Sequence, residues 1–159
     1  FALQENLDTI RTIYTNQIKY GVELETCFEA APDVAGYPDE LGQVWTNLIH
    51  NALQAMNYQG SLAIGLHEAG GWAEVRITDS GPGIPPEVLP NIFEAFYTTK
   101  RRGEGTGLGL HLCREIVQRH HGTIEVDTEP GRTTFIVRLP VYGAAAPAQV
   151  AELQAKARA

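Results

Sequence analysis

The sequence predicts an α+β fold in a single domain, since its 159 residues are enough to bury a substantial core. Three segments repeat their apolar residues with the period of an α-helix, and five shorter segments alternate as half-buried strands do. A long connection, from Ser80 to Gly107, separates the first five of these elements from the last three. Connections of this length inside a compact domain usually carry function.

The helices are expected over residues 4–19, 38–57 and 108–121. Pro38 suits the first turn of the second helix, and Asp39 and Glu40 complement the helix dipole there. We expect this helix to stop near Gly60. The apolar face of the first helix consists of Leu3, Leu7, Ile10, Ile13 and Tyr14. The apolar stripe of the second consists of Leu41, Val44, Trp45, Leu48, Ala52 and Met56.

The strands are expected over residues 21–28, 61–67, 72–78, 123–128 and 133–139. Gly70-Gly71 predicts a hairpin between the second and third strands, and residues 129–132 predict a turn between the last two. One short helical piece, over residues 87–93, is expected inside the long connection. The alanine-rich residues 143–159 are interpreted as a linker or tail, which leaves residues 1–142 as the domain.

Composition limits the classes of partner. The net charge of -7 argues against non-specific binding of nucleic acid, which requires a basic face. No apolar stretch approaches the ~20 residues of a membrane span. Cys27 and Cys113 lie too far apart for a CxxC site, and reduced thiols fit a cytoplasmic setting. Because the chain opens with Phe1, we expect it to be a piece of a longer protein, which can carry a membrane anchor elsewhere.

Asn47 and Asn51 lie four residues apart on the second helix, so they share one face at the edge of its apolar stripe. Gln54 lies close by on the same polar strip. Asparagine is a poor helix former, so a pair of them invites a functional explanation. Their amide oxygens suit Mg²⁺ or its water shell, because magnesium takes oxygen ligands. A solvated helix flank explains the same pattern.

Asp79 stands at the end of a strand and is followed by Gly81, Gly83 and Ile84. Glycines at this spacing let the backbone pass close to a flat ligand beside a rigidly held carboxylate. A carboxylate only accepts hydrogen bonds, so it selects a ligand with an amino group, such as adenine. An ordinary turn containing aspartate is the alternative.

The segment from Gly103 to Leu110 is rich in glycine and leads directly into the third helix. Glycine backbone and a helix N-terminus both present free N–H groups to phosphate. Lys100, Arg101 and Arg102 lie just upstream and add positive charge. The segment lacks the Gly-Lys-Ser or Gly-Lys-Thr of a Walker P-loop and the short strand–helix turn of a dinucleotide fold. A flexible loop without a ligand is the alternative.

Four motifs in this order resemble the N, G1, F and G2 boxes of bacterial sensor histidine kinases. The motifs are Asn47-Leu48-Ile49-His50-Asn51-Ala52, Asp79-Ser80-Gly81-Pro82-Gly83, the segment Ile92 to Lys100, and Gly105-Thr106-Gly107-Leu108-Gly109-Leu110. The resemblance covers roughly residues 1 to 140. These kinases belong to a wider superfamily with gyrase, the large heat-shock chaperone and mismatch-repair ATPases.

The resemblance implies a two-layer Bergerat-type fold, with a mixed sheet of about five strands and three helices on one face. It also implies ATP and Mg²⁺ as ligands. Asn51 would bind the metal with Asn47 as its partner, and Asp79 would read adenine above Gly81 and Gly83. The lid would run from about Phe93 to Gly107, with Lys100 as its cation. The implied phosphate contacts are Gly105, Thr106, Gly107, Leu108, Gly109 and Leu110. The segment Gly131 to Phe135 lacks the second glycine of the common pattern, so either Thr133 or Thr134 would lie near adenine.

The resemblance further implies that the γ-phosphate passes to a histidine on a separate dimerisation domain, and from there to a response regulator. The parent protein would then be a homodimer. None of the five histidines has the histidine–glutamate context of the acceptor, so we assign them solvated or packing roles; they are His50, His67, His111, His120 and His121. The alternatives are a superfamily ATPase, a protein serine kinase, or a degenerate domain that binds a partner. An ATPase would need a basic glutamate where Asn47 stands, and an amide is no base at neutral pH.

Overall fold

The computed structural model describes residues 1–18, 21–97 and 109–143. Its helices are α1 (Leu3–Ile18), α2 (Pro38–Ala55) and α3 (Gly109–Arg119), with one 3₁₀ turn, η1 (Leu89–Asn91). Its strands are β1 (Val22–Phe28), β2 (Gly60–Ala69), β3 (Trp72–Asp79), β4 (Thr123–Glu129) and β5 (Arg132–Pro140). Among the described residues, no helix combines the length and hydropathy that a membrane crossing requires.

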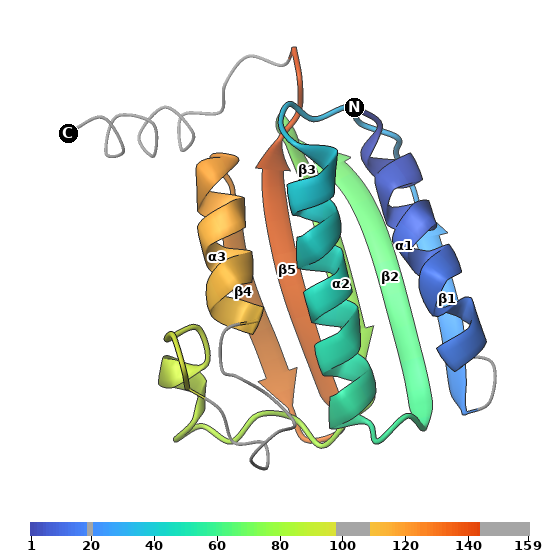
Figure 1. Cartoon of the computed structure of the whole chain (residues 1–159), viewed down its shortest axis with the longest axis vertical. Helices are drawn as coiled ribbons and strands as arrows, with labels where there is room; N and C mark the ends of the chain where they lie inside the picture. Colours follow the sequence, from blue (N-terminus) through green and yellow to red (C-terminus); the bar gives the residue numbers. More distant parts are fainter. Residues whose placement is uncertain (19–20, 98–108, 144–159) are drawn as a thin grey trace.

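The fold has two layers, a five-stranded sheet and the three helices that cover one of its faces (Figure 1). The strand order is β1-β2-β3-β5-β4. β1 runs parallel to β2, and the remaining neighbours are antiparallel, so the sheet is mixed. The predicted α+β class, the mixed sheet and the placement of the helices are confirmed.

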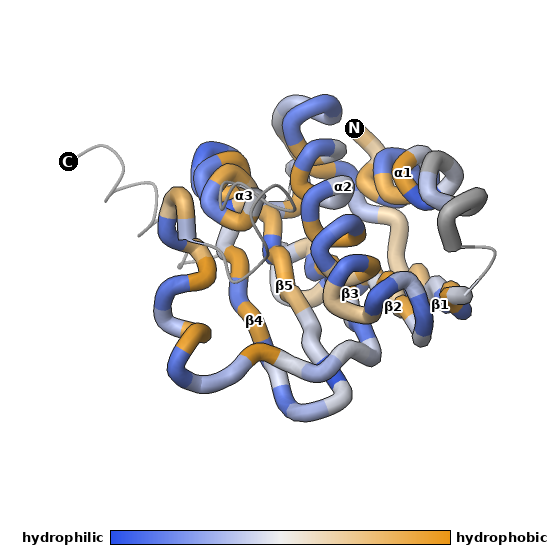
Figure 2. The backbone as a smooth tube through the Cα atoms, turned by 60° about the horizontal axis from the view of Figure 1, so that its bottom comes forward, coloured by the Kyte–Doolittle hydropathy of each residue, from blue (hydrophilic) through white to orange (hydrophobic). Residues whose placement is uncertain are grey.

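Helix α2 crosses the middle of the sheet and supplies a large part of the core. The apolar stripe predicted for it is buried throughout. Alternate residues of the strands face this helix, and hydrophobic and hydrophilic residues alternate along the chain accordingly (Figure 2). The buried residues of α2 are Leu41, Gly42, Val44, Trp45, Leu48, Ile49, Ala52 and Leu53.

A polar contact fastens α1 to α2. The indole Nε1 of Trp45 donates to Oδ1 of Asn6 at 2.7 Å, and Nδ2 of Asn6 donates to the carbonyl of Pro38 at 3.1 Å. Asn6 therefore satisfies the buried indole and binds the first turn of α2 at once. A buried indole N–H without such a partner would lose free energy.

A histidine joins α3 to the start of α2. The backbone N–H of Tyr37 donates to Nε2 of His120 at 3.0 Å, so Nδ1 carries the ring hydrogen and donates to the carbonyl of Ile116 at 2.8 Å. The ring lies directly on Gly36, where a Cβ atom would come within 2.1 Å of it. His120 thus has a packing role.

The turns bear out two predictions and correct a third. Gly70 and Gly71 have φ values of 58° and 82°, which suits the tight hairpin between β2 and β3. Gly131, with φ of 90°, turns the chain between β4 and β5. Gly60, however, does not end α2. The left-handed residues there are Asn57 and Tyr58, and Gly60 already begins β2.

The helix expected over residues 87–93 is wrong in extent, because only the 3₁₀ turn Leu89–Asn91 forms among turns. Pro90 lies inside it, and a proline supplies no N–H for a continuing helix. Helix α3 ends at Arg119, two residues earlier than predicted. The N–H of Gly122 returns to the carbonyl of Val117 after His121, which has φ of 61°.

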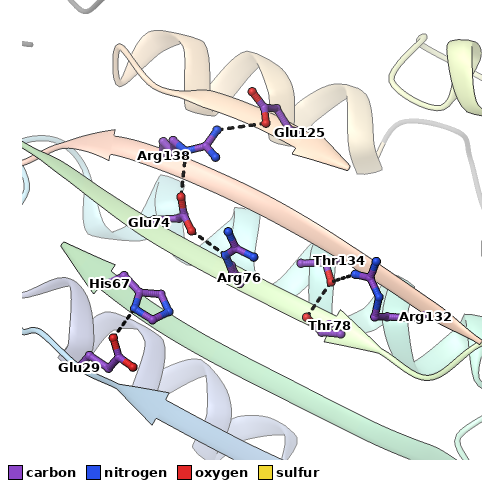
Figure 3. A network of polar contacts seen from close by, with 9 residues as sticks. All are labelled: Glu29, His67, Glu74, Arg76, Thr78, Glu125, Arg132, Thr134 and Arg138. Carbon is purple, nitrogen blue, oxygen red and sulfur yellow. Dashed lines mark hydrogen bonds and ion pairs between the residues drawn. The ribbon is translucent and has the colours of Figure 1, made fainter. Parts of the chain in front are cut away.

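The uncovered face of the sheet carries ion pairs, one within β3 and others between neighbouring strands (Figure 3). Glu74 accepts from Nε of Arg76 at 2.6 Å and from Nε of Arg138 at 2.9 Å, and Arg138 also contacts Glu125 at 3.1 Å. This face is therefore polar, as expected for a sheet with one face covered.

Leu48→Ala should lower the free energy of unfolding by about 2–5 kcal/mol, because this side chain of α2 is 0% exposed and its removal leaves a cavity. Leu112→Ala on α3 is the matched control, since that leucine is 37% exposed; its effect should stay within about 0.5 kcal/mol. Urea unfolding followed by tryptophan fluorescence measures both. Equal losses would contradict the placement of the core under α2.

Candidate functional site

Asp79 is the last residue of β3 and points to the helix-covered face of the sheet. It pairs with Leu62 of β2 on one side and with Thr133 of β5 on the other. The residue is only 3% exposed, and Oδ1 accepts a hydrogen bond from the N–H of Gly81 at 2.8 Å. Burial raises the pKa of this carboxyl, and the bond from Gly81 offsets part of the rise.

The two glycines after Asp79 lie where a side chain would collide. A Cβ at Gly81 would come within 2.9 Å of Oδ1 of Asp79 and 3.3 Å of the Ala55 carbonyl on α2. A Cβ at Gly83 would come within 2.5 Å of the Glu129 carbonyl, and the φ of Gly83 is 87°. At these two glycines the chain therefore passes close to the end of α2 and to the end of β4.

Thr128 ties this segment to the sheet. Its Oγ1 accepts from the N–H of Ile84 at 2.9 Å and lies 2.8 Å from Oγ1 of Thr133. Thr133 is 4% exposed and shares the face of Asp79. Thr134 lies on the opposite face, where its Oγ1 is 2.9 Å from that of Thr78 (Figure 3). Of the two threonines considered from sequence, the geometry thus places Thr133 beside Asp79.

Asn47, Asn51 and Gln54 lie along one edge of α2. The Oδ1 of Asn47 accepts from Gln43 at 2.9 Å, and its Nδ2 donates to the carbonyl of Gly109 at 3.4 Å. Asn51 is half-buried, and no hydrogen bond between described residues engages its side chain. Oε1 of Gln54 is buried and has no hydrogen-bond partner among the described residues. This edge therefore offers amide oxygens beyond those that the fold itself consumes.

Helix α2 brings the two halves of the predicted site together. Its C-terminal end contacts the turn after β3, where the N–H of Ser80 lies 3.4 Å from Sδ of Met56. Its middle reaches the start of α3 through Asn47 and Gly109. Eight residues of helix separate Asn47 from Ala55, which is ~12 Å at 1.5 Å per residue.

Gly109 and Leu110 are the first residues of α3, so their N–H groups belong to the unpaired first turn of a helix. The other residues predicted to contact phosphate lie outside the described residues; they are Lys100, Gly105, Thr106, Gly107 and Leu108.

Two residues at the site's edge make contacts that emerge only in three dimensions, although one of them, Phe93, belongs to the predicted motif Ile92 to Lys100. Thr128 is one, because strand pairing alone brings it to Ile84 and Thr133. Phe93 is another: its ring meets Phe135 edge to face at 6.3 Å, and the guanidinium of Arg114 lies 5.8 Å from its centre.

The donors at this site fit magnesium only together with a ligand that brings its own oxygens. Within the described residues, no group of three or more histidines, cysteines, aspartates or glutamates is placed to hold a metal. The amide oxygens of Asn51 and Gln54 suit a hard cation that keeps waters and phosphate oxygens in its shell. An ion held by phosphate and one or two amides is consistent with this set.

Proteins with similar sequences are sensor histidine kinases. The sensor histidine kinase ZraS of Escherichia coli (strain K12) is 41% identical over 117 residues, which are 73% of this chain and 25% of the relative. The sensory histidine kinase/phosphatase NtrB of Rhodobacter capsulatus is 39% identical over 123 residues, 69% of this chain and 34% of the relative. The chain thus spans about a quarter to a third of the length of these curated relatives.

Solved structures agree in fold. The catalytic domain of histidine kinase ThkA superposes with a TM-score of 0.81 at 30% identity, covering 89% of this chain and 93% of that one. The mycobacterial sensor histidine kinase MprB gives 0.80 at 28% identity, covering 89% and 97%. Residues 36–143 match the profile of one family, which is more than half of the chain. The chain belongs to the family described as histidine kinase-, DNA gyrase B- and HSP90-like ATPases, and within it resembles the ATP-binding domain of sensor histidine kinases.

Proposed function

We propose that this domain binds Mg·ATP between α2, the turn after β3 and the start of α3, and donates the γ-phosphate to a histidine on a separate dimerisation domain. The observation that carries the proposal is the buried carboxylate of Asp79 beside glycine backbone that no side chain can occupy. The phosphate would pass on to a response regulator, as expected for a two-component system in a cytoplasmic setting. The parent protein would act as a homodimer.

Adenine recognition falls to Asp79. Its carboxylate would accept from the exocyclic amino group of the base, with the backbone of Gly81 and Gly83 beneath the ring. The N–H of Gly81 donates to Oδ1 of Asp79, and among the described residues this is the bond that the carboxylate makes. Thr133 and Thr128 would line the same edge, because their hydroxyls lie on the face of Asp79.

The phosphates and the metal would lie toward α3. Asn51 would contribute an oxygen to Mg²⁺, and Asn47 would hold the start of α3 through its bond to Gly109. Bound magnesium would neutralise phosphate charge and orient the γ-phosphate. Gly109 and Leu110 would offer N–H groups, with Lys100, Gly105, Thr106, Gly107 and Leu108 completing the phosphate contacts.

The acceptor histidine is expected outside this chain. His67 pairs with Glu29 at 2.6 Å on the open face of the sheet, and His120 is buried between α2 and α3. His50 and His121 are exposed but lie outside any histidine–glutamate motif. An ATPase of the gyrase or chaperone kind is less well supported, because Asn47 stands where the water-activating glutamate would be.

Asp79→Asn should abolish selective binding of ATP while leaving the fold intact. The lost charged hydrogen bond predicts a roughly tenfold to hundredfold weaker ATP affinity. Calorimetric titration with ATP and GTP measures it, with Asp39→Asn at the exposed far end of α2 as the control. Retained preference for ATP over GTP would contradict the adenine role of Asp79.

The same substitution should change the pH dependence of stability. Because the pKa of Asp79 is raised in the native state, that state binds more protons than the unfolded chain above the ordinary pKa of 3.8. The contribution of Asp79 to stability therefore falls as pH rises through this window, and the loss is complete above the native pKa. Asp79→Asn should remove this decline and be no less stable at pH 7. Melting temperatures measured between pH 4 and pH 7 test the sign.

Asn51→Ala should weaken ATP binding by about tenfold in the presence of Mg²⁺ and have little effect in EDTA, because it removes a metal ligand. His50→Ala, on the exposed side of the same helix, is the matched control. Titrations with and without Mg²⁺ distinguish the two variants. A loss of equal size in EDTA would assign Asn51 to the nucleotide instead of the metal.

Gly83→Ala should both destabilise the domain and weaken ATP binding, since its Cβ meets the Glu129 carbonyl. Gly131→Ala is the matched control, because its φ of 90° is equally strained but its Cβ would enter open space. We expect Gly131→Ala to cost about 1–2 kcal/mol of stability without changing ATP affinity. If the two variants bind ATP equally well, the position of the glycine segment is not important for binding.

A further inference from the structure

Two side-chain contacts hold the first turn of α3 in place. One comes from α2, and the other is made by a residue of α3 itself. Asn47 on α2 donates to the carbonyl of Gly109 at 3.4 Å. His111, two residues further along α3, has Nδ1 3.3 Å from the carbonyl oxygen of Phe93. A carbonyl only accepts, so Nδ1 is the donor. His111 thereby joins α3 to the segment that follows η1.

Phe93 is a firm point of attachment. Its ring stands edge to face on Phe135, which is 1% exposed in β5, and the two ring centres are 6.3 Å apart. The guanidinium of Arg114 covers the ring at 5.8 Å. The packing of Phe93 on Phe135 therefore ties the carbonyl that His111 contacts to β5, the strand that also carries Thr133.

The other nitrogen of the imidazole lies close to a carboxylate of the same helix. Nε2 of His111 lies 3.2 Å from Oε1 of Glu115, one turn later on α3. The ring is 27% exposed and sits between these two acceptors. Nδ1 therefore faces Phe93 on one side of the ring while Nε2 faces Glu115 on the other, and the contact of Nδ1 with Phe93 links the first turn of α3 to the sheet.

We propose that His111 is a positioning residue that holds the N-terminus of α3 at the distance from the sheet that nucleotide phosphates require. The inference rests on the proposed function. The unpaired N–H groups of Gly109 and Leu110 act on phosphate only if the first turn is correctly placed. Adenine is read at Asp79, on another element, so the effect of His111 is confined to the phosphate end.

The test compares ADP with adenosine as probes of the whole chain. His111→Ala should weaken ADP binding by about three- to tenfold, the value of one hydrogen bond, and leave adenosine binding unchanged. Leu112→Ala, an exposed neighbour on the same helix, should change neither. A purely structural defect would weaken the binding of ADP and of adenosine together.

Two further variants separate the contacts of the ring. His111→Asn places an amide N–H near the position of Nδ1 and should restore ADP affinity through Phe93. His111→Gln places it near Nε2, where it reaches Glu115 only, and should behave like His111→Ala.

Each remaining result would overturn the inference. Equal ADP affinity of the unmodified chain and His111→Ala would remove the positioning role but leave ATP binding intact. Rescue by glutamine and not by asparagine would transfer the role to Glu115. An unmodified chain that binds neither ADP nor ATP would overturn the proposed function, and this inference with it.

Discussion

The burial of α2 across the middle of the sheet is the constraint on which the rest of the structure depends. A sheet with one apolar face must cover it, and α2 does so with eight buried residues. The other two helices are fastened to α2 by specific polar contacts, Asn6 to Trp45 on one side and His120 to Tyr37 on the other. The same helix also ends beside the turn after β3, so the packing that builds the core also assembles the site.

This packing explains why a carboxylate is buried where a stable fold would place an apolar residue. Asp79 continues the inward-facing row of β3, whose preceding members Val75 and Ile77 are core residues. Desolvation of the charged form costs stability, and among the described residues one backbone N–H, that of Gly81, offsets part of this cost. A ligand that donates to this carboxylate would recover part of that cost. The adenine contact proposed for Asp79 would therefore trade stability for selectivity, as expected where buried groups serve recognition.

The two faces of the sheet have separate tasks. Neighbouring threonines on β5 show the division: Thr133 joins Asp79 and Thr128 on the covered face, and Thr134 joins Thr78 and Arg132 on the open one. The open face carries partly exposed ion pairs, each of which contributes little to the free energy of folding. In the part of the chain that the structure describes, the amide oxygens of α2, the carboxylate of Asp79 and the N-terminus of α3 all lie on the covered face.

The sequence by itself determined the eight main elements, the apolar stripe of α2 and the order of the four motifs, because periodicity and glycine spacing are local properties. It failed where local signals conflict with proline geometry, as in the short helix expected over residues 87–93. Strand pairing decided that Thr133 and not Thr134 shares the face of Asp79, since a single-residue shift exchanges the faces of a strand. Tertiary contact alone brought Thr128 to Ile84 and His111 to the carbonyl of Phe93, because each pair lies far apart in the chain and local patterns do not reveal which residues meet.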